Sequence, residues 1–257
     1  MKHISSPDNP FYKELGKLSS SARQRGKTGQ TLLDGAHLLA SFLDSGNIPL
    51  HLVVTATAQL DPEIASLLNR VPDVPVTRLD DALFAGLSEL KSISGVLALI
   101  RVPQTEMRVQ ENNFCLLLEN IQDPGNLGSM LRSAAAAGCD AVFMSRGCAD
   151  AWSPKVLRAA MGGHFELDLH ENADLHAVAS SFPGPIYAAA LLADNNLYAT
   201  DLQGKIAFAI GNEGAGLSQA LLGMSKPVTI PMPGKIESLN AAAAAAICLF
   251  EAVRQRS

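Results

Sequence analysis

Apolar runs without polar alternation recur through the second half of the chain, separated by helix-like stretches. They occupy residues 114–118, 141–144, 186–192, 206–210 and 228–230. A strand that is apolar on both faces is typical of a parallel sheet covered by helices on both sides. The pattern therefore predicts an α/β domain built on a parallel sheet.

The first part of the chain also alternates strand-like and helix-like stretches. Strands are predicted at 31–33, 50–55 and 96–100. Helices are predicted at 12–18, at 37–43 and after Asp61-Pro62, because proline at the first helical position has no N–H that would be left unpaired. The Ser/Arg/Lys/Gly-rich stretch between the first helix and the first strand is interpreted as a loop.

A polar, aperiodic stretch, RVPQTEMRVQENN at 101–113, separates these two patterns. Such stretches commonly form domain boundaries. We therefore predict an N-terminal domain at 1–105, a linker at 106–113 and a C-terminal domain at 114–257.

Composition excludes several classes of protein. With 47% hydrophobic and 18% charged residues among 257, the chain is expected to fold rather than stay disordered. Its longest apolar run, 241–250, is half the ~20 residues that a membrane-spanning helix needs. The N-terminus also lacks the apolar stretch of a signal peptide, so a cytoplasmic protein without a membrane partner is predicted.

The four cysteines are scattered, with no CxxC pair and no histidines spaced to complete a metal site. Buried thiols are expected, with neither a disulfide framework nor a bound metal.

Charge is unevenly distributed along the chain. The net charge is −5, but residues 1–30 hold six basic and two acidic side chains, so this segment carries +4 and the remainder −9. A basic segment attracts a phosphate backbone, although a solvated helix face would have the same composition. Because aromatic residues make up only 5%, recognition by an array of stacking rings is not expected.

Three unusual loops follow predicted strands, where ligands bind in parallel α/β sheets. The first, at 119–133, contains the turn Asp123-Pro124-Gly125-Asn126 and leads into a helix that ends at Gly138. Arg132 lies about two turns into that helix. It would pair with a phosphate or simply be a surface cation.

The second loop, at 210–218, has three closely spaced glycines that let the backbone approach a ligand. It matches neither phosphate-binding fingerprint, and Glu213 at its centre would repel phosphate, so a neutral or cationic ligand is favoured. The third loop, at 230–240, is rigid because it holds two prolines and a glycine. Ser238 is placed as the N-cap of the helix at 241–246, which leaves Asn240 without a structural explanation.

In order, DPGNLGSMLRSA, IGNEGAGLS and IPMPGKIESLNAAAA resemble the three motifs of the SpoU/TrmH family of RNA ribose 2′-O-methyltransferases, within the SPOUT superfamily. The resemblance covers the chain from residue 114 onward. It implies a trefoil-knotted domain that binds S-adenosylmethionine, a homodimer, and an RNA partner rather than DNA. No sequence periodicity would suggest the knot, because knots are essentially absent among folds.

The N-terminal segment, from LLDGAHLLASFLDSG through SISGVLALI, is similar to the substrate-binding domain that many members carry, which resembles ribosomal protein L30e. Asp34 and Ser94 stand where the family commonly has Glu and Gln. The fold predicted is therefore α/β throughout, with a knotted parallel-sheet domain and a smaller L30e-like domain.

The resemblance implies a catalytic group. Arg132 is the catalytic arginine, and Asn126 helps to place it. Glu213 would orient Arg132 across the site or across the dimer interface, while Ser238 and Asn240 would position the substrate and the arginine. Since a guanidinium almost always keeps its proton, we favour a role in holding phosphate and stabilising the developing alkoxide over that of a general base.

Cofactor contacts are implied in the same way. Gly211, Ile230 and Leu239 match positions that contact the adenine and ribose of the cofactor, and Met232 lies alongside. Elsewhere, core packing is the favoured interpretation of Trp152. Lys155 and Arg158 are candidate phosphate contacts.

The favoured function is methyl transfer to a ribose 2′-hydroxyl in structured RNA, with ribosomal RNA favoured over transfer RNA because of the extra N-terminal domain. The alternative is a catalytically silent RNA-binding module of the same fold. A nucleotide-binding hydrolase is a third possibility, but the chain has no Lys-[ST] phosphate motif.

Overall fold

The computed structural model describes residues 1–88, 94–191, 193–235 and 237–257. Residues 92–93 of the stretch SISGVLALI and residue 192 of the predicted strand 186–192 lie outside these ranges. The chain divides into two compact units, which are described separately. Unit 1 is Met1–Gln104 with Trp152–Phe165, and unit 2 is Thr105–Ala151 with Glu166–Ser257.

Unit 1 contains a mixed five-stranded sheet with the order β1-β4-β3-β5-β2. Its strands are β1 (Lys2–Ile4), β2 (Gln30–Asp34), β3 (His51–Val54), β4 (Val76–Leu79) and β5 (Val96–Arg101). Strands β1, β4 and β3 run parallel, whereas β5 runs antiparallel to β2 and β3. The strands predicted at 31–33, 50–55 and 96–100 are therefore confirmed. Strands β1 and β4 were not predicted, because they are short and not continuously apolar.

Helices cover this sheet. They are α1 (Pro10–Ser20), α2 (Ala22–Thr28), α3 (Ala36–Asp44), α4 (Pro62–Arg70), α5 (Asp81–Ala85) and α7 (Pro154–Ala160), with short 3₁₀ turns at η1 (Ala58–Leu60) and η2 (Gly163–Phe165). The predicted helix after Asp61-Pro62 is confirmed as α4. The Asp61 carboxylate caps it by accepting from the backbone N–H groups of Glu63 and Ile64.

The prediction of a loop before β2 is wrong, because residues Ala22–Thr28 of this stretch form helix α2. The Ser21 hydroxyl caps its start by accepting from the Gln24 backbone N–H, and Gly29 ends it with φ +63°. Arg25 is only 6% exposed and donates to the backbone oxygens of Leu18 and Ser19. This member of the basic segment therefore packs inside the unit instead of offering its charge to a partner.

The segment Trp152–Phe165 packs within unit 1, although its sequence predicts that it belongs to the C-terminal domain at 114–257. The Thr31 hydroxyl donates to the Trp152 backbone oxygen at 2.7 Å, and the ring of Phe165 meets the edge of Phe42. Trp152 is 5% exposed, which confirms core packing. These apolar and hydrogen-bonded contacts are long-range, so no local pattern signals them.

Unit 2 is built on a six-stranded sheet with the order β11-β9-β10-β6-β7-β8, and every pairing is parallel. Its strands are β6 (Phe114–Leu118), β7 (Ala141–Met144), β8 (Asp168–His170), β9 (Ile186–Ala189), β10 (Ile206–Ile210) and β11 (Lys226–Val228). The parallel sheet is confirmed, with β6, β7 and β10 at the predicted positions.

Two strand predictions in unit 2 need correction. Strand β9 ends at Ala189, and β11 ends at Val228 instead of running through 228–230. Thr229 and Ile230 consequently belong to the loop after the strand. Strand β8 was not predicted, because its three residues include two polar ones.

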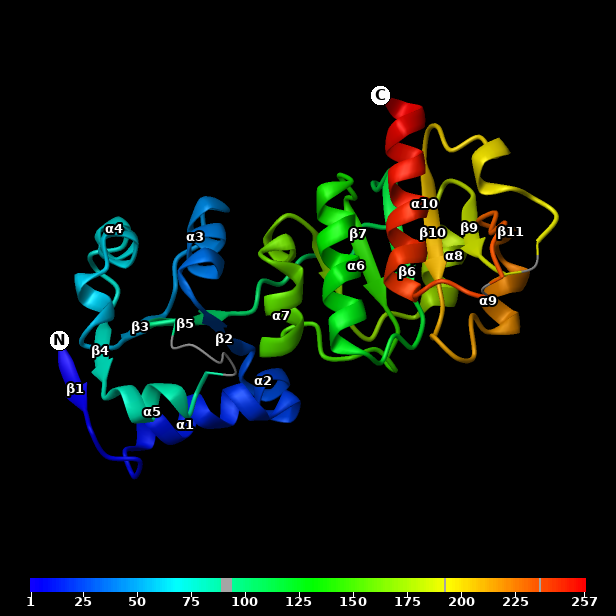
Figure 1. Ribbon diagram of the computed structural model, residues 1–257. Coiled ribbons are helices and arrows are strands. Elements are labelled where there is room, and N and C mark those ends of the chain that lie inside the picture. Colours follow the sequence, from blue (N-terminus) through cyan, green and yellow to red (C-terminus); the bar gives the residue numbers. More distant parts are fainter. Residues whose placement is uncertain (89–93, 192, 236) are drawn as a thin grey trace. The chain divides into compact units, whose positions relative to one another are not determined.

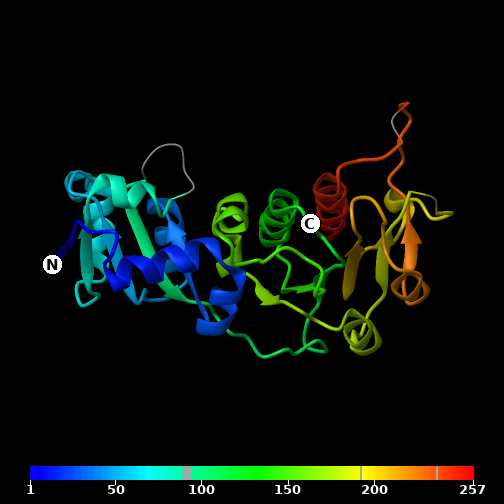
Figure 2. The same ribbon diagram turned by 90° about the horizontal axis from the view of Figure 1, so that it is seen from below.

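Helices cover both faces of this sheet. In Figure 1 and Figure 2, α6 (Pro124–Ala136) and α10 (Ala241–Arg256) lie side by side on one face, while α8 (Leu175–Ser181) and α9 (Gln219–Gly223) cover the other. The buried residues include Cys115, Cys139 and Cys248, which are free thiols. Burial raises the pKa of Cys115 and of Cys248 to about 12, so these thiols stay protonated and unreactive at neutral pH.

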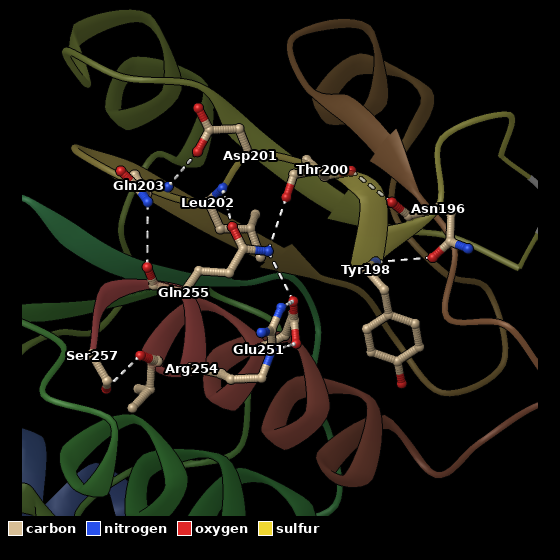
Figure 3. Close-up of polar contacts among 11 residues, drawn as sticks. Asn196, Tyr198, Thr200, Asp201, Leu202, Gln203, Glu251, Arg254, Gln255 and Ser257 are labelled. Atoms are coloured by element: carbon tan, nitrogen blue, oxygen red, sulfur yellow. Dashed lines mark hydrogen bonds and ion pairs between the residues drawn. The ribbon is translucent and has the colours of Figure 1, made fainter.

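Hydrogen bonds join the C-terminal end of α10 to the segment that follows the 3₁₀ turn η3 (Leu197–Ala199), as Figure 3 shows. Gln255 donates to the Thr200 backbone oxygen and to Glu251, and it accepts from the Leu202 backbone N–H. Arg254 donates twice to Glu251, at 2.9 and 2.7 Å. These charge-assisted bonds hold the pKa of Glu251 at about 2.

Among the described residues, no helix is both long and apolar enough to cross a membrane.

Candidate functional site

A cavity of about 410 Å³ opens where β9, β10 and β11 end and α10 begins, all within unit 2. Its described lining residues come from the ends of these strands and from the second and third loops: Ala189, Ala190, Leu191, Ile210, Gly211, Asn212, Glu213, Gly214, Gly216, Val228, Thr229, Ile230, Met232, Ser238, Leu239, Asn240, Ala241 and Ala244. The volume is in the range of small-molecule sites.

The four residues predicted to contact a cofactor all line this cavity. Gly211 comes directly after β10, Ile230 and Met232 follow β11, and Leu239 precedes α10. Three of the predicted catalytic residues, Glu213, Ser238 and Asn240, line the same space. The structure thus brings two loops of distant sequence together around one pocket.

The second loop closes on itself through Asn212 and Gly216. Their backbone groups exchange two hydrogen bonds, and the Asn212 side-chain oxygen accepts from the N–H groups of Gly214 and Ala215. A Cβ atom at position 211 would overlap the backbone of Gly216 and Leu217. Glycine at 211 is therefore required for this closed loop, which forms one wall of the cavity.

Hydrogen bonds connect all three loops beside the cavity. The Asn240 amide nitrogen donates to Asn126 Oδ1 at 2.9 Å, and the Asn126 amide nitrogen donates to Glu213 Oε1 at 2.9 Å. The Asn240 oxygen is occupied, because it accepts from the backbone N–H groups of Ala242 and Ala243. The direction of the series is therefore fixed, and Glu213 is its final acceptor.

The predicted N-cap is wrong. Asn240, not Ser238, caps α10, with φ −55° and ψ 138°. The residue that the sequence left unexplained thus has a structural role as well as a place in the cavity wall. Ser238 is exposed and lines the cavity two residues earlier.

Arg132 lies on the exposed side of α6, as Ser129 and Ala136 do. It is not among the described residues that line the cavity, and it forms no hydrogen bond or ion pair with any described residue. Within one chain, Asn126 and Glu213 therefore contact each other rather than Arg132. The two candidate phosphate contacts, Lys155 and Arg158, are exposed on α7 in unit 1.

Several lining residues were not predicted from the sequence. Ala189, Ala190, Val228, Ala241 and Ala244 are small or apolar and carry no chemical signature. Their only signal was position, because they lie at strand ends or on the first turns of a helix that faces the loops.

The cavity fits a nucleoside with a cationic group. Leu191, Ile210, Ile230 and Leu239 supply apolar walls for a purine, and Glu213 places a carboxylate at the same space. Neither lysine nor arginine is among the described lining residues, so a polyphosphate is disfavoured. Fold and site together define a parallel α/β protein with a nucleoside-sized pocket at its strand ends, beside which hydrogen bonds join three loops.

Comparison with known proteins identifies the family. The sequence model of the SpoU rRNA Methylase family matches residues 113–250, and the chain belongs to this family. The 23S rRNA (guanosine(2553)-2′-O)-methyltransferase RlmP of Bacillus subtilis is 32% identical over 97% of this chain and 98% of its own.

Two solved structures are similar over nearly the whole chain. A crystal structure of an RNA 2′-O ribose methyltransferase has a TM-score of 0.85 and 31% identity, and covers 99% of both chains. The SpoU methyltransferase AviRb from Streptomyces viridochromogenes, in complex with the cofactor AdoMet, has a TM-score of 0.88 and 27% identity, covering 96% of this chain and 98% of its own.

Proposed function

We propose that this protein transfers a methyl group from S-adenosylmethionine to a ribose 2′-hydroxyl in ribosomal RNA. The observation that carries the proposal is the series Asn240–Asn126–Glu213, which links all three motif loops beside a nucleoside-sized cavity. The activities named for the Bacillus subtilis relative and for the similar crystal structures support it.

Gly211, Ile230, Met232 and Leu239 would hold the cofactor, with the adenine between the apolar walls. The carboxylate of Glu213 would attract the positive charge of the sulfonium in S-adenosylmethionine. It would therefore favour the cofactor over the thioether that remains after methyl transfer, whose sulfur is neutral. When bound, S-adenosylmethionine supplies an electrophilic methyl carbon on a sulfonium. The protein's task is to orient the ribose hydroxyl and to stabilise the charge that develops on it.

Arg132 would supply that stabilisation. Its guanidinium is exposed on α6 and is paired with no described residue, so it is available for the phosphate and the developing alkoxide of an RNA substrate. Asn126 and Asn240 act as positioning residues for Glu213, and Ser238 contacts the substrate from the cavity wall.

A homodimer would complete the site. Arg132 lies outside the cavity of its own chain, and the neighbouring helix α10 carries an apolar stripe of the exposed Ala243, the half-buried Ile247 and Phe250, which is 46% exposed. Such a stripe, continuous with α6, suits a second copy of the same helices. In this arrangement, the partner subunit's Arg132 reaches the cavity.

Three further features belong to the same proposal. The loops of unit 2 form the trefoil knot of the SPOUT superfamily. Unit 1 is the L30e-like domain that binds the RNA, with the exposed Lys17, Arg23 and Lys27 as candidate phosphate contacts. The cytoplasmic location stays a prediction.

Incubation with methyl-labelled S-adenosylmethionine and ribosomal RNA tests the proposal. After digestion to nucleosides, the label is expected in a 2′-O-methylnucleoside. RNA binding without incorporation would instead favour the silent RNA-binding module of the same fold. Thermal stabilisation by ATP but not by S-adenosylmethionine would favour the hydrolase.

A further inference from the structure

A second cavity, of about 370 Å³, lies beside the first in unit 2. Asn120, Gln122, Leu217 and Ser218 are among its lining residues, and Asn212 and Gly216 line both cavities. The hydrogen-bonded pair Asn212–Gly216 is therefore a partition between the two spaces. None of the predicted site residues is among the described residues that line the second cavity.

The second cavity is called the recess below. Its polar groups are held in place by a left-handed backbone conformation and by close packing. Asn120 has φ +56°, and its backbone oxygen accepts from the Asn212 amide at 2.9 Å. A Cβ atom at Gly147 would overlap the Asn120 side chain, so that side chain is held in a space only glycine leaves open. Left-handed backbone is uncommon at non-glycine residues, and asparagine adopts it more readily than most because its short polar side chain can form local hydrogen bonds.

Some side-chain hydrogen-bonding groups in the recess have no partner among the described residues. The Asn120 amide oxygen accepts from Ser145, but its amide nitrogen has no partner among the described residues. Gln122 is exposed, and its side-chain amide likewise forms no hydrogen bond within the described chain. The Ser218 hydroxyl accepts from the Leu221 backbone N–H and keeps its own hydrogen available.

This combination suits the edge of a nucleobase. Side-chain amides offer donors and acceptors in one plane, as base recognition requires, and the buried Leu217 provides an apolar contact. The described lining holds no lysine or arginine, so it does not suit a phosphate. A base and its ribose are joined by a single bond, and a base recess must therefore adjoin the methyl-donor cavity.

We propose that this recess binds the base of the nucleotide whose ribose is methylated, and that Gln122 helps to select that base. The inference rests on the proposed function. With the ribose at the mouth of the first cavity, near Glu213, the base lies behind the Asn212–Gly216 partition and meets the Asn120 and Gln122 amides. Target choice at the modified position is then made by the methyltransferase unit itself.

The test compares full-length wild type with Gln122→Ala and Gln122→Glu. The methylated position is first mapped in RNA from cells with and without the gene. Four RNA fragments that differ only in the base at that position are then methylated, and kcat/KM is measured for each. Both variants are expected to reduce the preference for the natural base by about three- to tenfold, the value of one hydrogen bond. Gln122→Glu, which exchanges the donor for an acceptor, should also change the order of preference.

Gln110→Ala is the matched control, because Gln110 is an exposed glutamine of the same unit outside the recess. It should keep the wild-type preference, and all variants should bind S-adenosylmethionine equally well. An unchanged preference in both Gln122 variants, or a wild type that accepts all four bases equally, overturns this inference while leaving the methyltransferase function intact. If the wild type incorporates no methyl group into any RNA, the proposed function fails and the inference fails with it.

Discussion

The amide nitrogen of Asn240 donates a hydrogen bond to the side-chain oxygen of Asn126 at 2.9 Å, and this bond joins the first turns of α10 and α6. Each asparagine is tied to its own helix: the Asn240 oxygen caps α10, and the Asn126 backbone N–H is bound by the Asp123 cap. The Asn126 amide is therefore aimed at Glu213 by two helix ends, which makes the position of the carboxylate depend on both loops.

The first prediction concerns Asn126→Asp. The change removes the donor to Glu213 and puts two carboxylates within hydrogen-bond distance, so they repel and Glu213 moves. We expect kcat to fall by about 10²-fold. Because Glu213 is among the described residues lining the cavity and Asn126 is not, the Kd for S-adenosylmethionine should also rise, but by no more than about tenfold and so by less than kcat falls. Steady-state kinetics and calorimetry measure the two quantities, and equal losses in both would contradict the positioning role.

Gly211→Ala tests the shape of the cavity. The added methyl group would meet the backbone of Gly216 and Leu217, so the closed loop must open. Affinity for S-adenosylmethionine should fall by at least about tenfold, which corresponds to ~1.4 kcal/mol. Gly214→Ala is the control in the same loop, since its methyl group would have only an ordinary contact with Asn212 at 3.5 Å. Equal affinities of the two variants would show that the loop does not depend on glycine at 211.

Complementation tests whether Arg132 acts on the partner's cavity. Arg132→Lys and Glu213→Gln are purified separately, then mixed under conditions that allow subunits to exchange. If the partner subunit's Arg132 serves each cavity, every mixed dimer has one intact site, and about a quarter of wild-type activity returns. If Arg132 serves its own chain, no mixed dimer has an intact site and activity stays absent.

Glu251→Gln tests the fastening of α10. The folded pKa of Glu251 is about 2 against an ordinary value of 4.5, because Arg254 and Gln255 donate to its charged form. A depressed pKa stabilises the fold above pH 4.5, and this contribution is lost as pH falls from 4.5 towards 2. At pH 7 the variant should lose about 1–3 kcal/mol of unfolding free energy. Denaturant titrations should show the difference from wild type disappearing over that acidic range.

Glu14→Gln is the control for that titration, because Glu14 is exposed. It should change stability little at any pH. A difference between wild type and Glu251→Gln that persists unchanged at pH 2 would show that the loss comes from packing and not from the charge.

Sequence patterns predicted the parallel sheet of unit 2 because apolar strands such as β6 and β10 are continuous and end in turn residues. The resemblance to the SpoU/TrmH motifs, and not the apolar pattern, identified the cavity residues Gly211 and Ile230, because the pattern placed Ile230 inside a strand. Two short elements were not predicted. Strand β8 has only one apolar residue, and helix α2 contains a glycine in its interior and a buried arginine, neither of which is typical of a helix. Their formation depends on tertiary contacts that no local window contains.

The site, like the fold, was predicted only in part. The resemblance to the SpoU/TrmH motifs singled out Asn126, Glu213 and Asn240, but not the hydrogen bonds that connect them, one of which spans 114 positions of sequence. The N-cap was assigned to Ser238 because serine and asparagine both cap helices, and only the backbone geometry distinguishes them. The exposed position of Arg132 follows from the rotation of α6, which a turn-rich loop sequence does not define.

The most direct test of the account is the turnover of Arg132→Lys with ribosomal RNA and labelled S-adenosylmethionine, measured beside cofactor affinity. The lysine keeps the charge but loses the planar, two-pronged donor geometry. We predict at least about a 10²-fold loss of kcat, the usual effect of removing one donor to a developing oxyanion, with cofactor affinity unchanged. Turnover within a few-fold of wild type would contradict the claim that this guanidinium activates the ribose hydroxyl.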